Sequence, residues 1–248
     1  LAGPGQSVGE NSHVTASVSD WTVSSDELTA LCPNLVHVAL VVSWFGDDLR
    51  CGSCSISPRV EAADRDILGT NWSVAGLGRG SVPVVSRHEG GAAYGGTPSD
   101  AAVLAAIADL KARGLKVTLY PLLMMDVPAD NVLPDPRDGT TGQPAYPWRG
   151  RITCDPAPGR DGTADKCAAA REQVEALAGG ALPGHFLDGD ATVAFTGGDD
   201  WGYRRLVLHY AHLAAMAGGV DAFLVGSELR GLTTLRDQAG AFPFVEVL

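Results

Sequence analysis

The chain has 248 residues and is 45% apolar, which is typical of a globular protein that buries a sizeable core. Its formal net charge of −11 argues against a nucleic-acid partner. No apolar run approaches 18 residues, so we expect no membrane span.

The first part of the chain predicts a linker, a short helix and a buried strand. Residues 1–23 are rich in Gly, Ser and Thr and lack the features of a secretory signal, so we expect a linker or the end of a preceding domain in a longer polypeptide. A helix is expected at residues 24–31, where Ser precedes Asp and Glu. Residues 35–45 are nearly continuously apolar, like a strand buried on both faces of a parallel sheet. Trp44 and Asp47 lie where this strand ends.

Residues 46–96 form an insertion much longer than an ordinary βα loop. Such an insertion provides either a binding surface or an architectural arm, and a strand is expected within it at 82–86. Cys51 and Cys54 have the spacing of a metal or redox pair, but no second CxxC pair accompanies them. A metal site, a disulfide and free thiols remain open for these cysteines, and we predict no metal and no cofactor.

The next unit reads as a crossover between two parallel strands. Residues 97–100 supply a helix cap, Val103 and Ile107 continue at helical spacing, and Gly114 ends the helix. Residues 116–125 form the second expected strand, and Asp126 follows it directly. A helix between two such strands is the usual right-handed unit of α/β folds.

Residues 127–162 are rich in Pro, Gly, Arg and Asp and predict a long loop. Trp148, Arg149 and Arg151 stand together in it. Aromatic and guanidinium groups interleaved in this way suit stacking on a sugar or clamping an acidic group. The equally plain alternative is that Trp148 only pins the loop to the domain.

The remaining chain repeats the alternation. We expect a helix at 163–178 capped by Thr163, a third strand at 190–196, a helix from 199 to 217, a fourth strand at 221–225 and a final helix at 242–248. His209 and His212 lie three residues apart in a helix and are interpreted as ordinary core or surface imidazoles. Glu228 follows the fourth strand.

Four strands alternating with helices predict an α/β fold, the first half of a (β/α)8 TIM barrel, over residues 24–248. Catalytic groups of this fold stand after the carboxyl ends of the strands, where Glu228 and Asp126 lie. In a large clan of retaining glycosidases the acid/base is a Glu after strand four, commonly preceded by Asn, whereas Ser227 precedes Glu228 here. Retention needs a second carboxylate about 5 Å away; its expected position lies beyond Leu248, and Asp126 is the only substitute on this rim.

Five segments together resemble a known family. They are SWFGDDLRCGSC (43–54), AAYGGTPSD (92–100), LYPLLMMD (119–126), YPWRGRIT (146–153) and GSELRGLTTLR (226–236). In this order they are similar to the glycoside-hydrolase TIM-barrel-like domain of the tail-tip (baseplate) protein of gene transfer agents and siphophage-like particles. The resemblance implies a multidomain tail component, assembled in the bacterial cytoplasm, whose partners are the hub and fibre proteins.

Two functions follow from this resemblance. The first is a structural tail-tip component that engages the host cell envelope through its barrel, with a surface glycan as a further partner. The second is an active retaining glycosidase that degrades peptidoglycan or surface polysaccharide during entry, with Glu228 as acid/base and Asp126 as a weaker catalytic candidate. Trp44, Asp47, Trp148, Arg149 and Arg151 are the expected substrate-binding residues.

Overall fold

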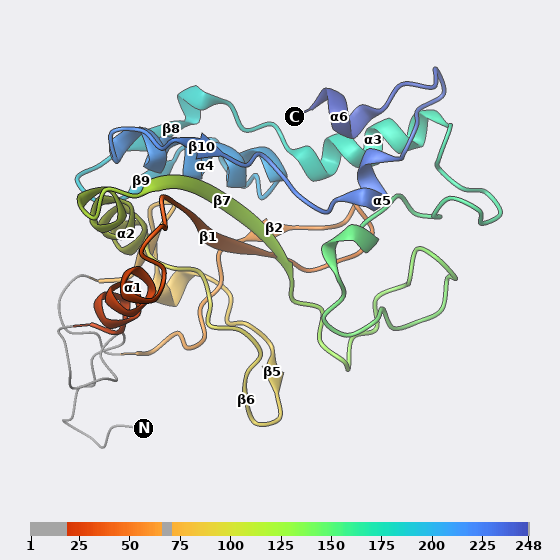
Figure 1. Cartoon of the computed structure of the whole chain (residues 1–248). Coiled ribbons are helices and arrows are strands. Elements are labelled where there is room, and N and C mark those ends of the chain that lie inside the picture. Colours follow the sequence, from red (N-terminus) through yellow and green to blue (C-terminus); the bar gives the residue numbers. More distant parts are fainter. Residues whose placement is uncertain (1–18, 66–70, 248) are drawn as a thin grey trace.

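The computed structural model describes residues 19–65 and 71–247, and its centre is one open sheet (Figure 1). β1 (His37–Gly46) and β7 (Lys116–Met125) pair in parallel over their whole length. The short strand β10 (Ala222–Phe223) lies parallel to β7 on its other side, and β2 (Ile56–Ser57) runs antiparallel to β1. The strand order is therefore β10-β7-β1-β2, and the sheet is not closed into a barrel.

The brevity of β10 has a cause in β7. The carbonyls of Val117 and Leu119 accept hydrogen bonds from the N–H groups of Asp221 and Leu224. The next residue of β7 that faces this side is Pro121, which has no N–H to continue the ladder. The chain after β10 therefore leaves the sheet early and turns across the ends of the strands.

The two faces of the sheet differ in burial. Val42 and Trp44 of β1 share a face with Leu119 and Leu123 of β7, and all four are buried. On the opposite face Val41 is 49% exposed. The expectation that residues 35–45 are buried on both faces was therefore wrong for the first half of the strand, where burial alternates and stays incomplete.

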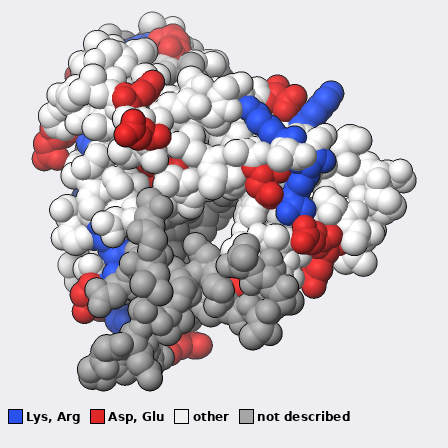
Figure 2. Space-filling view, turned by 90° about the vertical axis from the view of Figure 1, so that its left-hand side faces the viewer, with Lys and Arg blue, Asp and Glu red and all other residues white. Residues whose placement is uncertain are grey.

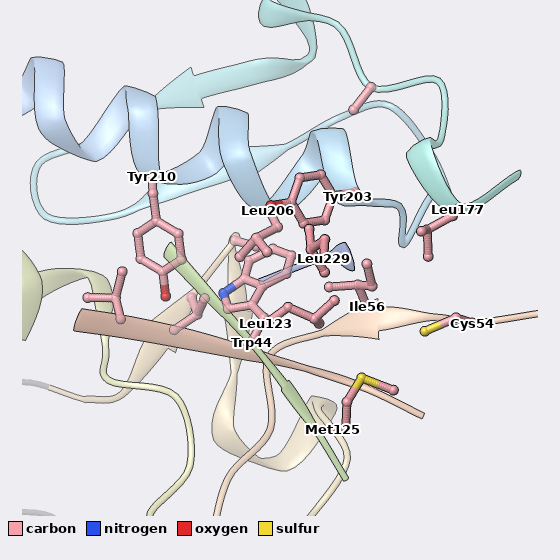
Figure 3. Packing of buried hydrophobic residues seen from close by; sticks show 14 of the residues in the cluster. Trp44, Cys54, Ile56, Leu123, Met125, Leu177, Tyr203, Leu206, Tyr210 and Leu229 are labelled. Atoms are coloured by element: carbon pink, nitrogen blue, oxygen red, sulfur yellow. The ribbon is translucent and has the colours of Figure 1, made fainter. Parts of the chain in front are cut away.

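Helices α2 (Asp100–Ala112) and α4 (Tyr203–Met216) contact β7 and each other. Ser99 caps α2 by accepting from the N–H of Ala102, as the sequence predicts for this region. The buried Asp100 then joins α2 to α4, because its Oδ1 lies 2.9 Å from Nε2 of His209. Figure 3 shows Trp44 enclosed between the strands and a helix, with Leu206 and Tyr210 around it.

The amino-terminal helix α1 (Asp20–Leu31) starts earlier than expected, because Ser19 caps it. Its Trp21 donates from Nε1 to Asp109 of α2 at 2.8 Å. Of the predicted linker at 1–23, residues 1–18 lie outside the described chain. Within the described ranges, no helix is both long enough and apolar enough to cross a membrane.

The third strand is the main correction to the predicted topology. Residues 190–196 do contain a strand, β9 (Val193–Phe195), but it pairs antiparallel with β8 (Phe186–Asp188) in a separate hairpin. The main sheet thus holds three parallel strands. Glu228 follows the third of them, β10, and the prediction that it follows a fourth was wrong.

The insertion after β1 folds into short pieces. They are β2, β3 (Ser73–Val74), β4 (Leu77–Gly78), the 3-10 helix η1 (Arg79–Ser81), β5 (Arg87–His88) and β6 (Gly91–Ala92). In place of the strand expected at 82–86 there is one isolated bridge between Val60 and Val84. The insertion is anchored to the carboxyl end of β7, because Arg59 and Ser86 both bind Asp126 there.

Five elements of the described chain remain. They are the 3-10 helices η2 (Arg149–Arg151) and η3 (Pro183–His185) and the helices α3 (Ala168–Ala178), α5 (Arg230–Thr233) and α6 (Pro243–Glu246). Thr163 does not cap α3; its hydroxyl donates to the carbonyl of Pro156, and Cys167 precedes the helix. The final helix lies where the sequence predicts it, with Phe244 packed against Tyr203 at 5.6 Å.

Candidate functional site

The carboxylate of Glu228 is bound by two side chains of the long loop, Trp148 and Arg149, which were also predicted as site residues. Its Oε2 accepts a hydrogen bond from Nε1 of Trp148 at 2.8 Å. The same oxygen forms an ion pair with Nη2 of Arg149 at 2.7 Å. The Glu228 side chain is still 53% exposed, whereas that of Arg149 is 13% exposed. The structure thus brings together three of the seven predicted site residues around one carboxylate.

The backbone at Glu228 is left-handed, with φ 57°. A non-glycine residue in this region costs roughly 1 kcal/mol or more relative to an ordinary conformation. The turn brings the Glu228 side chain back towards η2, where Trp148 and Arg149 bind it. Before the turn, Tyr203 donates from Oη to the carbonyl of Val225 at 2.8 Å and fixes the end of β10.

Two further residues belong to the same network and were missed from the sequence. Tyr120 of β7 and Ser227 hydrogen-bond to each other through their hydroxyl groups. Nη2 of Arg149 lies 3.3 Å from both hydroxyl oxygens, and its Nε donates to the carbonyl of Ser227. The alternation of side chains along β7 could have indicated Tyr120, because this polar residue lies on the strand face opposite to the buried Leu119 and Leu123.

Two glycines allow the loop and the helix α5 to approach. A Cβ built on Gly150 would lie 2.4 Å from a ring carbon of Trp148, so the indole lies directly against this backbone. A Cβ on Gly231 would lie 2.2 Å from the carbonyl oxygen of Ile152. Both positions require glycine for steric reasons. Trp148 is nevertheless 48% exposed, so part of its ring remains open to solvent.

A cavity of about 300 Å³ lies beside Glu228. Its polar lining comes from Ser227, Glu228, Arg230 and Thr233, and Phe244 contributes an aromatic wall. A volume near the lower end of that of small-molecule sites, with few polar groups, is compatible with a small ligand or one sugar unit.

Asp126 lies at the end of β7 and is fully engaged in the structure. Its Oδ2 accepts from Nη1 of Arg59 at 2.7 Å and from the N–H of Ser86 at 2.9 Å, and its Oδ1 accepts from the Ser86 hydroxyl at 2.5 Å. The carboxylate is buried. These contacts give Asp126 a role in anchoring the insertion, and it does not line the Glu228 cavity.

The other predicted substrate-binding residues lie elsewhere. Trp44 has no exposed surface, and its ring centroid lies 5.3 Å from that of His209 and 6.3 Å from that of Tyr210. Asp47 accepts from the N–H of Ser55, and burial raises its pKa above the ordinary value. Arg151 lies at a second cavity, 3.8 Å from Asp135.

The cysteines that the sequence left open are free thiols, and Cys51, Cys54 and Cys154 are buried. Burial raises the pKa of Cys54 to about 12. In the described part of the chain, no group of three or more His, Cys, Asp or Glu side chains is placed to hold a metal ion. His209 and His212 each face a carboxylate, Asp100 and Asp188 respectively.

Charge is unevenly distributed over the surface. Figure 2 shows a face on which acidic groups are scattered and basic side chains gather mainly in one band, next to acidic ones. On the helices α1 and α2, Arg113 pairs with Asp26 and Asp109, at 2.6 and 2.8 Å. These two ion pairs neutralise the charge of Arg113.

Residues 201–248 match a family model described as the GTA TIM-barrel-like domain. No curated protein matches the chain. The matched residues include α4, β10, α5 and α6 and therefore Ser227 and Glu228, but not Trp148 or Arg149. The resemblance inferred for residues 24–248 is thereby supported for its last part.

Proposed function

We propose that residues 24–248 form the amino-terminal part of a glycoside-hydrolase-like TIM barrel in a tail-tip protein of a gene transfer agent or siphophage-like particle. The family match at 201–248 is the observation that carries this proposal. Its partners would be the hub and fibre proteins of the tail, and the complete particle would be assembled in the bacterial cytoplasm.

Within that particle, we propose that the site around Glu228 binds a glycan of the host cell envelope. The exposed part of the Trp148 ring provides an apolar platform of the kind on which sugar rings pack. Glu228 fixes the orientation of this ring through Nε1, and Arg149 in turn fixes Glu228. The neighbouring cavity offers Ser227 and Arg230 as hydrogen-bonding groups.

The geometry favours binding over hydrolysis. A general acid needs a free carboxyl oxygen that faces the scissile bond, and on Glu228 only Oε1 is left for that task, because Oε2 accepts from Trp148 and pairs with Arg149. Retaining hydrolysis also needs a second carboxylate about 5 Å away. Asp126, the predicted substitute, is occupied by Arg59 and Ser86. An active retaining glycosidase remains the second candidate, because Glu228 is exposed at the end of a parallel strand.

Association with particles tests the first part of the proposal. The full polypeptide carrying a tag would be produced in its native host, and particles would be separated on a density gradient. We expect the protein to sediment with tails. Recovery only in the fractions without particles would contradict a tail role.

Envelope binding and catalysis are tested by separate variants of the full polypeptide. Trp148→Ala should leave assembly intact and reduce adsorption of particles to cells, because the sugar platform is removed. Glu228→Gln tests catalysis through release of reducing ends from purified envelope. Its control is Glu172→Gln on α3, an exposed carboxylate with no ion pair among the described residues. Turnover by the wild type that is lost only in Glu228→Gln would favour the glycosidase.

A further inference from the structure

A second cavity, of about 350 Å³, lies behind Trp148. Three guanidinium-bearing residues line it: Arg137 and Arg151 of the long loop, the latter at the end of η2, and Arg230 at the start of α5. Trp148 forms part of its wall, and no acidic residue does. Arg230 also lines the Glu228 cavity, so the two cavities are adjacent.

The charges of these arginines are poorly neutralised. Arg151 has one long ion pair, at 3.8 Å from Asp135, and is 38% exposed. Arg137 only donates to the carbonyl of Arg151 at 3.4 Å, and Arg230 makes no side-chain hydrogen bond or ion pair within the described residues. The chain as a whole has a net charge of −11, so a cavity lined by three arginines and no acidic residue differs in charge from the rest of the molecule.

Two carboxylates of the long loop, Asp135 and Asp138, are engaged within the loop itself. Asp135 is buried and accepts from the N–H of Arg137 through Oδ1, at 2.7 Å. Asp138 accepts from the N–H and the hydroxyl of Thr140, and these hydrogen bonds lower its pKa. Neither lines the cavity. The lining of this cavity is therefore basic.

Arg149, which the sequence offered as an acid clamp, is not available for this task. Its Nη2 and Nε are occupied by Glu228, Tyr120 and Ser227. The arginines available to bind an acidic group therefore line the second cavity, and two of them, Arg137 and Arg230, were not among the predicted site residues.

We propose that this second cavity binds the acidic group, carboxylate or phosphate, of a charged saccharide whose neighbouring sugar ring packs on Trp148. This inference rests on the proposed glycan binding and adds the chemical class of the glycan. Arg presents a planar array of donors that matches carboxylate and phosphate oxygens. Trp148 borders the cavity, so a ring on its exposed part places a charged substituent within reach of Arg230.

The test is calorimetric titration of the full chain with three defined probes. An oligogalacturonide carries carboxylates, a phosphorylated mannan oligosaccharide carries phosphates, and maltoheptaose is neutral. We expect the acidic probes to bind at least about tenfold more tightly than the neutral one, because charge-assisted hydrogen bonds are stronger than neutral ones. Which acidic probe binds more tightly identifies carboxylate or phosphate as the preferred group.

Variants then locate the binding. Arg137→Gln combined with Arg230→Gln should remove most of the preference for acidic probes, since both side chains are exposed and their loss does not disturb the core. Arg236→Gln is the matched control, because its guanidinium lies over Phe242 outside the cavity. An equal loss in the control would show nonspecific charge attraction and overturn the proposal.

The outcomes separate this inference from the proposed function. Equal binding of neutral and acidic probes, or an unchanged preference in the double variant, refutes the arginine site but leaves glycan binding intact. If the wild type binds acidic and neutral probes equally and Trp148→Ala loses all glycan binding, only the charged-ligand claim is refuted. Absence of any glycan binding by the wild type refutes both the charged-ligand claim and the glycan-binding proposal, while tail association is decided independently.

Discussion

Asp126→Asn distinguishes a structural carboxylate from a catalytic one. The substitution keeps the volume of the side chain and removes its charge, so Arg59 loses its ion-pair partner. The Asp126 side chain has no exposed surface and that of Arg59 is 14% exposed, so water replaces little of the lost interaction. Two bonds from Ser86 are also altered, because an amide offers only one acceptor oxygen.

The expected cost is about 3 kcal/mol of unfolding free energy, since breaking a buried ion pair on one side costs roughly 3–5 kcal/mol. The lower value applies because Asn still accepts one hydrogen bond and Arg59 retains some contact with water. Against a total stability of about 5–15 kcal/mol, such a loss is easily measured.

Urea unfolding of the full chain at pH 7, followed by far-ultraviolet circular dichroism, is the assay. The matched control is Asp130→Asn, which lies four positions later and is exposed, so its effect should stay within about 0.5 kcal/mol. A double-mutant cycle with Arg59→Gln should give a coupling of about 1–3 kcal/mol. If Asp126→Asn is as stable as the control, the anchoring role of Asp126 is refuted. If this variant also loses glycan turnover at unchanged stability, Asp126 has a catalytic role instead.

Two further predictions concern titratable groups. Because burial raises the pKa of Asp47, its charged form destabilises the fold at neutral pH, and this penalty disappears as the pH falls through the folded-state value. Asp47→Asn should therefore raise the urea midpoint at pH 7, with a smaller gain at pH 4; an equal gain at both values would exclude this cause. Thiol titration of the native chain should label only the exposed cysteines, and urea should release the remainder; rapid native labelling of all five would contradict the burial. The exposed thiols are Cys32 and Cys167, and the buried ones are Cys51, Cys54 and Cys154.

The strands that the sequence predicted well are those with sharp polar boundaries. β7 begins at Lys116 and ends before Asp126, so its observed bounds equal the predicted ones. Residues 190–196 show the limit of the same reasoning: alternation predicts that a strand exists, but not which strand it pairs with. The partner β8 contains only three residues and shows no period that could have been recognised.

Trp44 was assigned to the site because it stands near the end of a strand, but position along a strand does not decide which face a side chain occupies. Its face follows from the pairing of Trp44 with Leu123, a register that appears only in the folded sheet. Glu228 was named as a candidate because it comes soon after an apolar strand. Arg137 and Arg230 were not, since arginines in irregular segments have no periodic signal and are brought together only by tertiary contacts.

The pairing of β1 with β7 has a consequence for the order of folding. Residues 47–115 lie between these two strands, so the long parallel ladder forms only after the whole insertion and α2 have been synthesised. Closing such a loop costs conformational entropy before any ladder contact compensates for it, and contacts distant in sequence slow folding. The hairpins β3–β4, β5–β6 and β8–β9 join neighbouring segments and carry no such delay. During synthesis β1 therefore emerges with its apolar residues unpaired, and its protection from aggregation depends on how soon β7 follows.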